Sequence, residues 1–138
     1  MAGADAALEA AGLPMVLGEP LLGEWSEAWG REAAVRLIRS GAEFDGVFCA
    51  SDEIARGVAD GLRENGVAVP EAVGIVGVDN WLVMATASRP PLTTIDLNLA
   101  ELGHLAATRL LRAIDGHYIS PGIERVSPDL IKRRSTEI

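Results

Sequence analysis

Hydrophobic residues gather in short blocks along the chain, and the length of each block predicts the element it forms. Three blocks predict strands, and one of them, 73–78, is the near-continuous apolar run expected of a parallel strand that is covered on both faces. The three blocks span residues 45–50, 73–78 and 92–95. The run Pro14–Gly18 predicts a further short buried strand, and 121–134 predicts one or two end strands divided near Pro128.

Segments with helical periodicity separate these blocks. Ile54, Val58 and Leu62 recur every four residues and mark one face of a helix that begins after Ser51. Further helices are predicted over 2–11, from Ser26 to Gly41, and over 97–114, the longest. Strand and helix therefore alternate, which predicts an α/β fold with a parallel sheet and right-handed crossovers.

Composition narrows the class of protein. The chain has 138 residues, of which 49% are hydrophobic and 23% charged, as expected of a globular domain. Its net charge of −8 argues against a nucleic-acid surface, because phosphate contacts need clustered Lys and Arg. No apolar stretch approaches the ~20 residues of a membrane span, and the first residues lack the pattern of a signal peptide. We expect a cytoplasmic protein without a membrane partner.

Residues with catalytic or metal-binding chemistry are few. The single cysteine, Cys49, excludes an internal disulfide and lies in an apolar run typical of the core. His104 and His117 have no second ligand at helical spacing, so no metal or other cofactor is predicted. The sequence contains no glycine-rich phosphate loop, nucleophile elbow or HExxH motif, and we expect that the protein is not an enzyme.

Polar residues follow the predicted strands, where ligands bind in open α/β sheets. They are Trp25 after the predicted strand at 14–18, Ser51 and Asp52 after the strand at 45–50, and Asp79, Asn80 and Trp81 after the strand at 73–78. Carboxylates, an amide and a hydroxyl beside indole rings suit a sugar or related polyol. Each residue also has a structural explanation: Ser51 and Asp52 as a helix cap, Asp79 and Asn80 as a turn, and Trp25 as a helix-start anchor.

Several stretches together resemble one known family. FDGVFCASDEIARGVADGLRENGVAVPEAVGIVGVDN, followed by PPLTTIDLNLAELGHLAATRLL, is similar to the C-terminal part of LacI/GalR-family transcriptional repressors, and PDLIKRRST resembles that family's last strand. The resemblance covers residues 2–136. It implies a two-lobed, type I periplasmic-binding-protein-like domain with its effector between the lobes. Residues 1–95 would belong to the C-terminal lobe, 96–118 to a crossover helix of the N-terminal lobe, and 119–138 to strands returning to the C-terminal lobe.

The resemblance also implies roles for the rim residues. Asp79 matches an aspartate that bonds effector hydroxyls, Ser51 and Asp52 match a polar position and the aspartate after it, and Trp25 matches an aromatic of the cleft. Asn80 is expected beside them. Asp96 and Leu97 stand where the family often has a glutamine, and the family's cleft arginine would precede Gly3, where this chain has only Met1 and Ala2.

By this resemblance the chain is the effector-binding and dimerisation part of a repressor. DNA would be bound only through a separate helix-turn-helix domain, and the chain would form a homodimer or swapped oligomer. The expected interface residues are Ile54, Arg56, Val58, Trp81, Leu82 and Met84. The apolar face of 97–114 is expected to pack on another copy.

Two alternatives stay open. A periplasmic sugar-binding transport protein would share the fold, although the PPLTTI stretch and the first residues count against it. A Mg²⁺-dependent phosphoryl-transfer enzyme could use Asp52 and Asp79, but no Lys or Arg lies at a predicted strand end to face a phosphate.

Overall fold

Four strands form one sheet in the order β1-β2-β3-β4, in a computed structural model that describes residues 2–137. The elements are α1 Ala2–Ala11, α2 Glu27–Arg39, β1 Gly46–Phe48, α3 Asp52–Glu64, β2 Gly74–Val78, α4 Leu82–Ala87, β3 Thr93–Asp96, α5 Leu99–Ile114 and β4 Asp129–Ile131. The first three strands are parallel, and β4 runs antiparallel to β3. The predicted α/β fold is confirmed, with a mixed sheet in place of a wholly parallel one.

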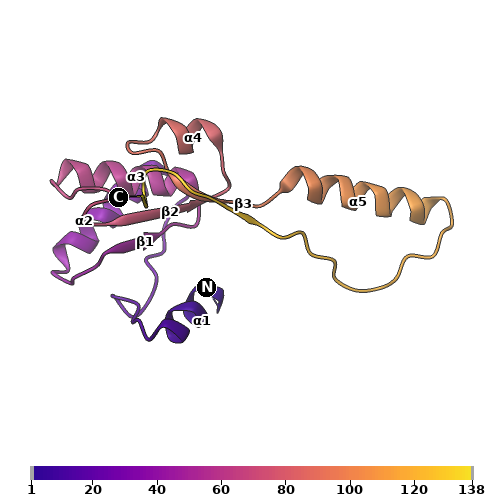
Figure 1. Cartoon of the computed structure of the whole chain (residues 1–138), viewed down its shortest axis with the longest axis horizontal. Coiled ribbons are helices and arrows are strands. Elements are labelled where there is room, and N and C mark those ends of the chain that lie inside the picture. The colour runs from indigo at the N-terminus through magenta and orange to yellow at the C-terminus, as the bar shows by residue number, and fades with distance from the viewer. Residues whose placement is uncertain (1, 138) are drawn as a thin grey trace.

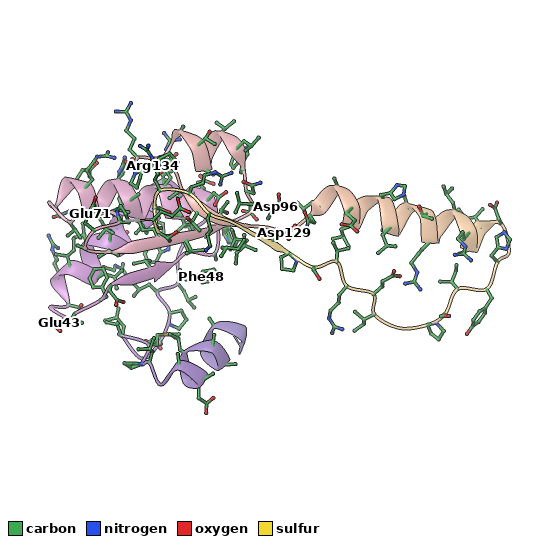
Figure 2. All side chains as sticks on the ribbon, in the orientation of Figure 1. Glu43, Phe48, Glu71, Asp96, Asp129 and Arg134 are labelled. Carbon is green, nitrogen blue, oxygen red and sulfur yellow. The ribbon has the colours of Figure 1, made fainter. Side chains whose placement is uncertain are left out.

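The body and an arm are distinct parts of the molecule (Figure 1). The body holds the sheet with α2, α3 and α4, and α1 lies beside it. The arm consists of α5 and the segment that returns from it to β4. Asp96 and Asp129, which pair where β3 meets β4, lie at the base of the arm (Figure 2).

The predicted strand at Pro14–Gly18 is wrong. This segment forms a turn in which the Gly18 N–H donates to the Met15 carbonyl at 2.9 Å. A strand needs a neighbour to satisfy its backbone groups, and β1, at the edge of the sheet, pairs only with β2. Of the predicted end strands, only Asp129–Ile131 forms.

Helices α2 and α3 begin where the sequence predicts. Ser26 and Ser51 are their N-caps, and each hydroxyl accepts a hydrogen bond from a backbone N–H three residues later, at 3.1 and 3.2 Å. The two helices pack closely through glycines. Because a Cβ on Gly57 would lie 2.2 Å from the Glu27 carbonyl oxygen, only glycine fits at this contact.

The core lies between α3 and the sheet. Its buried members are Ala34, Cys49, Ala55, Val58, Ala59, Leu62, Val73, Ile75, Ala85 and Leu92. Small residues predominate, which matches a sequence with few aromatics. Val58 and Leu62, on the predicted apolar face of α3, are almost wholly buried.

The thiol of Cys49 is expected to be unreactive in the folded chain. It is buried in this core, and burial, with the charge of Asp52 as a smaller cause, raises its pKa to about 12. Because the thiolate is the reactive form, reaction with a disulfide reagent at pH 8 should proceed only as fast as the chain opens. Rapid labelling of the native chain, before any loss of helical circular dichroism, would contradict this placement.

The arm carries an apolar surface that the body does not cover. No residue of α5 is buried, and Leu99, Leu110 and Ile114 are each more than 60% exposed. Arg109 joins α5 to the returning segment through an ion pair with Glu124 and a hydrogen bond to the Ser120 carbonyl. The packing of this face on another copy stays a prediction. Within the described residues, no helix is long and apolar enough to cross a bilayer.

Candidate functional site

The carboxyl ends of β1, β2 and β3 form a rim where most of the predicted site residues lie. Ser51 follows β1 and caps α3, and the Asp79-Asn80 turn follows β2. Gly30 of α2 lies against the Ile54 carbonyl near the start of α3, so α2 begins at the same end of the sheet as α3. Trp25 lies just before α2 and therefore at this end too. Its indole is 66% exposed. The structure therefore brings these residues to one end of the sheet, and their part in binding a ligand stays a prediction.

Asp52 is a buried brace beneath this rim. Its side chain is fully buried, and its two carboxylate oxygens accept hydrogen bonds from Thr94 Oγ1 at 2.6 Å and the Trp81 N–H at 2.8 Å. Burial raises the pKa of Asp52, against the opposing effect of these hydrogen bonds. Because both oxygens already have protein donors, the geometry favours a positioning role over direct contact with a ligand.

The Asp79-Asn80 turn has an uncommon backbone. Both residues have positive φ, 103° and 49°, a region that non-glycine residues seldom occupy. The turn is held to β3 because the Asp79 N–H donates to the Ile95 carbonyl at 2.9 Å and the Asn80 N–H donates to Thr94 Oγ1 at 3.2 Å. Such backbone strain collects at functional sites.

Asp79 is the carboxylate that this turn presents to solvent. The residue is exposed, yet partial burial of its carboxyl raises its pKa. None of the hydrogen bonds among the described residues uses a carboxylate oxygen of Asp79. Its oxygens are therefore available to accept hydrogen bonds from ligand hydroxyls.

The side chain of Asn80 is occupied within the protein. Its Oδ1 accepts from Arg133 Nη2 at 2.7 Å, and its Nδ2 donates to Asp96 Oδ2 at 2.9 Å. Thr94 and Arg133 are parts of the site that the sequence did not predict, and Asp96 stands at the position where the family resemblance expects a glutamine. Thr94 and Arg133 lie in the PPLTTI and PDLIKRRST stretches, but nothing in either stretch shows contact with a turn up to 53 residues away.

The rim carries groups of the kind that contact polyols, and their part in binding a ligand stays a prediction. It combines the exposed side chains of Asp79, Trp25 and Trp81, whereas Ser51 is only 3% exposed and its hydroxyl accepts from the Ile54 N–H. The exposed groups can bond the hydroxyls and cover the C–H face of a polyol. Among residues 2–137, no cluster of three or more His, Cys, Asp or Glu side chains is placed to hold a metal.

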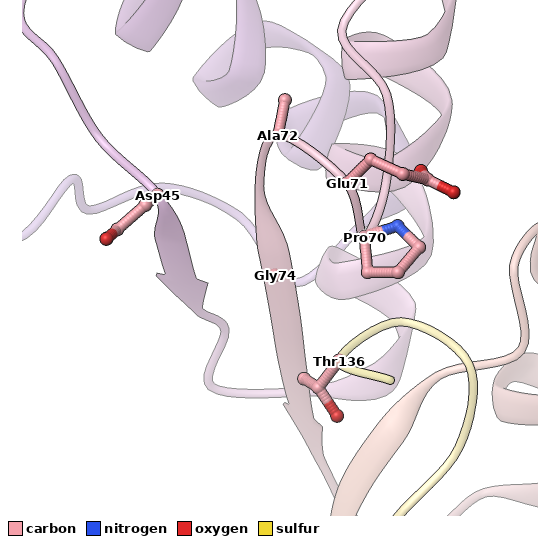
Figure 3. Close-up of a pocket in the computed structure, with 6 residues that line it drawn as sticks. All are labelled: Asp45, Pro70, Glu71, Ala72, Gly74 and Thr136. Carbon is pink, nitrogen blue, oxygen red and sulfur yellow. The ribbon is translucent and has the colours of Figure 1, made fainter. Parts of the chain in front are cut away.

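A shallow hollow of approximately 310 Å³ lies at the other end of the sheet (Figure 3). It is lined by Asp45, Pro70, Glu71, Ala72, Gly74 and Thr136, at the amino ends of β1 and β2. The hollow is open and shares no residue with the rim.

The predicted interface residues separate into exposed and buried groups. Trp81 and Leu82 are 51% and 60% exposed at the start of α4, beside Val83 at 65%. Met84, Ile54 and Arg56 are half-buried, and Arg56 Nη1 lies 3.4 Å from the Met84 sulfur. Val58 is only 1% exposed, so its burial assigns it to the core and not to a surface that a partner can reach.

The whole architecture matches one family of ligand-binding domains. The model of the periplasmic binding protein-like domain matches residues 1–136, and the chain belongs to this family. Its relatives define the class more narrowly: it corresponds to part of the effector-binding domain of LacI-family transcriptional regulators.

Three relatives illustrate the match. The helix-turn-helix-type regulator AscG of Escherichia coli is 34% identical over 88% of this chain and 36% of its own length. A LacI-family regulator from Enterococcus faecium with bound ribose is 33% identical, with a TM-score of 0.79 over 96% of this chain and 48% of that one. The regulator CelR in complex with cellobiose is 29% identical, with a TM-score of 0.84 over 96% and 40%.

The match also defines how much of such a protein is present. The chain spans about a third of the length of the curated relative, AscG. These relatives are transcriptional regulators, which favours the regulator interpretation over a periplasmic transport protein and over an enzyme.

Proposed function

We propose that this chain supplies one wall of the effector cleft of a LacI-family transcriptional regulator, and that the effector is a small sugar or related polyol. The observation that supports this most directly is the exposed Asp79 carboxylate on a strained turn at the carboxyl end of β2. The solved relatives with bound ribose and with cellobiose point to the same class of ligand.

Each rim residue has a proposed part in binding. Asp79 accepts hydrogen bonds from sugar hydroxyls, and Trp25 covers an apolar face of the ring. Ser51 is only 3% exposed and its hydroxyl accepts from the Ile54 N–H, so its proposed part is to cap α3 beneath the rim. Asp52 and Asn80 act differently, because their polar atoms are held by Thr94, Trp81, Asp96 and Arg133. They fix the shape of the surface that the sugar meets.

In the complete regulator, sugar binding would change the affinity of a separate DNA-binding domain. A ligand can do this only if it binds two conformations with unequal affinity. The crossing strands β3 and β4, which join the body to the arm, are the proposed place of that change (Figure 2).

We also propose that the chain dimerises through the surface around α4. Trp81, Leu82 and Val83 form an exposed apolar group there, with Met84, Ile54 and Arg56 beside it. The alternative assembly that we propose is a swapped oligomer, in which α5 covers an apolar face of another copy. Sedimentation equilibrium should give a mass above one chain, and Leu82→Glu should lower it if α4 is the contact.

Thermal unfolding with sugars tests the proposed binding. Ribose or cellobiose at ~100 times its dissociation constant should stabilise the chain by about 2.7 kcal/mol. Asp79→Asn should abolish most of this gain because it removes the charged acceptor. Asp45→Asn, in the hollow at the other end of the sheet, is the matched control and should leave the gain unchanged. Equal gains in all three proteins would refute the proposed role of Asp79.

A further inference from the structure

The guanidinium of Arg133 reaches from the last strand to the turn at the rim. Just beyond β4, the Arg133 N–H donates to Thr93 Oγ1 at 2.8 Å, which fixes the base of its side chain. Its Nη1 donates to the Leu92 carbonyl at 2.9 Å and its Nη2 to Asn80 Oδ1 at 2.7 Å. The side chain therefore spans two acceptors from a fixed backbone position, which the rigid fork of arginine permits and lysine does not.

The turn that Arg133 contacts needs external support. Asp79 and Asn80 hold two consecutive positive φ angles, which non-glycine residues keep only where the surrounding structure fixes them. Arg133 and Asp96 hold the two ends of the Asn80 amide, at 2.7 and 2.9 Å. Asp96 is itself fixed, because its Oδ1 accepts from the Asn98 N–H at 2.8 Å.

We propose that Arg133 is a positioning residue for effector binding, acting through Asn80 to hold the turn that presents the Asp79 carboxylate. The ligand part of this inference rests on the proposed function, whereas the support of the turn does not. Charge helps as well as geometry, because Arg133 is half-buried and faces the region of Asp52, Asp79 and Asp96. The hydrogen bond to a charged donor is worth more than one between neutral groups.

Amide hydrogen exchange in the free chain tests the support. In Arg133→Gln the Asp79 and Trp81 amides should exchange about tenfold faster than in the native chain, since a charge-assisted hydrogen bond is lost. The amide of Val58, in the core of α3, is the internal reference for folding and should keep its rate. Arg134→Gln, at the exposed neighbouring arginine (Figure 2), is the matched control and should change none of them.

A second variant removes the acceptor in place of the donor. Asn80→Gly leaves Arg133 intact and tolerates positive φ, so it tests the contact without adding backbone strain. It should speed exchange at Asp79 and Trp81 at least as much as Arg133→Gln does, because it also removes the hydrogen bond to Asp96, and adding Arg133→Gln to it should have no further effect. Additive effects would overturn the proposal, as would unchanged rim exchange in Arg133→Gln or an equal acceleration at Val58.

Adding ribose or cellobiose to the same samples separates the two proposals. If both hold, the sugar that stabilises the native chain and Arg134→Gln should bind Arg133→Gln about tenfold more weakly. Equal affinity for the two arginine variants would overturn the positioning role. If neither sugar protects any variant, the proposed function fails, while the exchange rates in the free chain still decide whether Arg133 supports the turn.

Discussion

Gly57→Ala is expected to destabilise the chain by about 3 kcal/mol or more, because an added Cβ would overlap α2. That Cβ would lie 2.2 Å from the Glu27 carbonyl oxygen and 2.9 Å from the Glu27 Cα, and backbone atoms cannot swing aside as a side chain can. Helices α2 and α3 would have to separate, and the core beneath them would open. Urea unfolding followed by circular dichroism measures the loss.

The control for this change is another helical glycine. Gly103, in α5, has nothing within 4 Å of the position of a Cβ and is exposed. Gly103→Ala should therefore be neutral, or stabilising by up to about 1 kcal/mol, because alanine favours a helix over glycine. Equal losses in the two variants, or none in Gly57→Ala, would show that α2 and α3 do not pack as described.

Asp52→Ala should cost the chain about 2–4 kcal/mol and loosen the rim at the same time. It leaves the Thr94 hydroxyl and the Trp81 N–H in a buried place without their acceptor. Asp52→Asn should be much milder, since an amide oxygen can accept from Trp81 and its nitrogen can donate to Thr94. Equal unfolding free energies for the two variants at pH 7 would show that the hydrogen bonds of Asp52 to Thr94 and Trp81 do not stabilise the chain.

The pH dependence of stability offers a separate check on Asp52. Burial raises its pKa above the ordinary value of 3.8, so the folded state disfavours the charged form. This contribution to stability is therefore fully present below the ordinary pKa and is lost as pH rises through the pKa of the folded state. The loss should be smaller in Asp52→Asn, and an identical pH profile for both proteins would oppose burial of the carboxyl.

Local sequence patterns predict most of the body. The period of Ile54, Val58 and Leu62 predicts α3, and the run 73–78 predicts β2, because each buries one apolar face or both. Ser51 predicts the helix start, since a cap depends on neighbours within a few residues. These features are local, and the structure confirms them.

The errors concern residues whose partners lie far away in sequence or outside the chain. Pro14–Gly18 has the composition of a strand but no strand beside it. Asp52 is a carboxylate at a strand end, as expected of a ligand contact. One of its oxygens, however, already accepts a hydrogen bond from Thr94, 42 residues later. Arg133 gives no local signal at all, because its role depends on Asn80, 53 residues earlier.

Mapping where a sugar binds tests the central claim most directly. Amide and indole chemical shifts of the labelled chain should be followed by nuclear magnetic resonance while ribose, and then cellobiose, is added. The account predicts that changes concentrate at Asp79, Ser51 and the Trp25 indole, with none at Asp45 or Thr136 in the hollow at the other end of the sheet. Changes centred on that hollow, or no changes at saturating concentrations of either sugar, would contradict the assignment of this rim as a wall of an effector site.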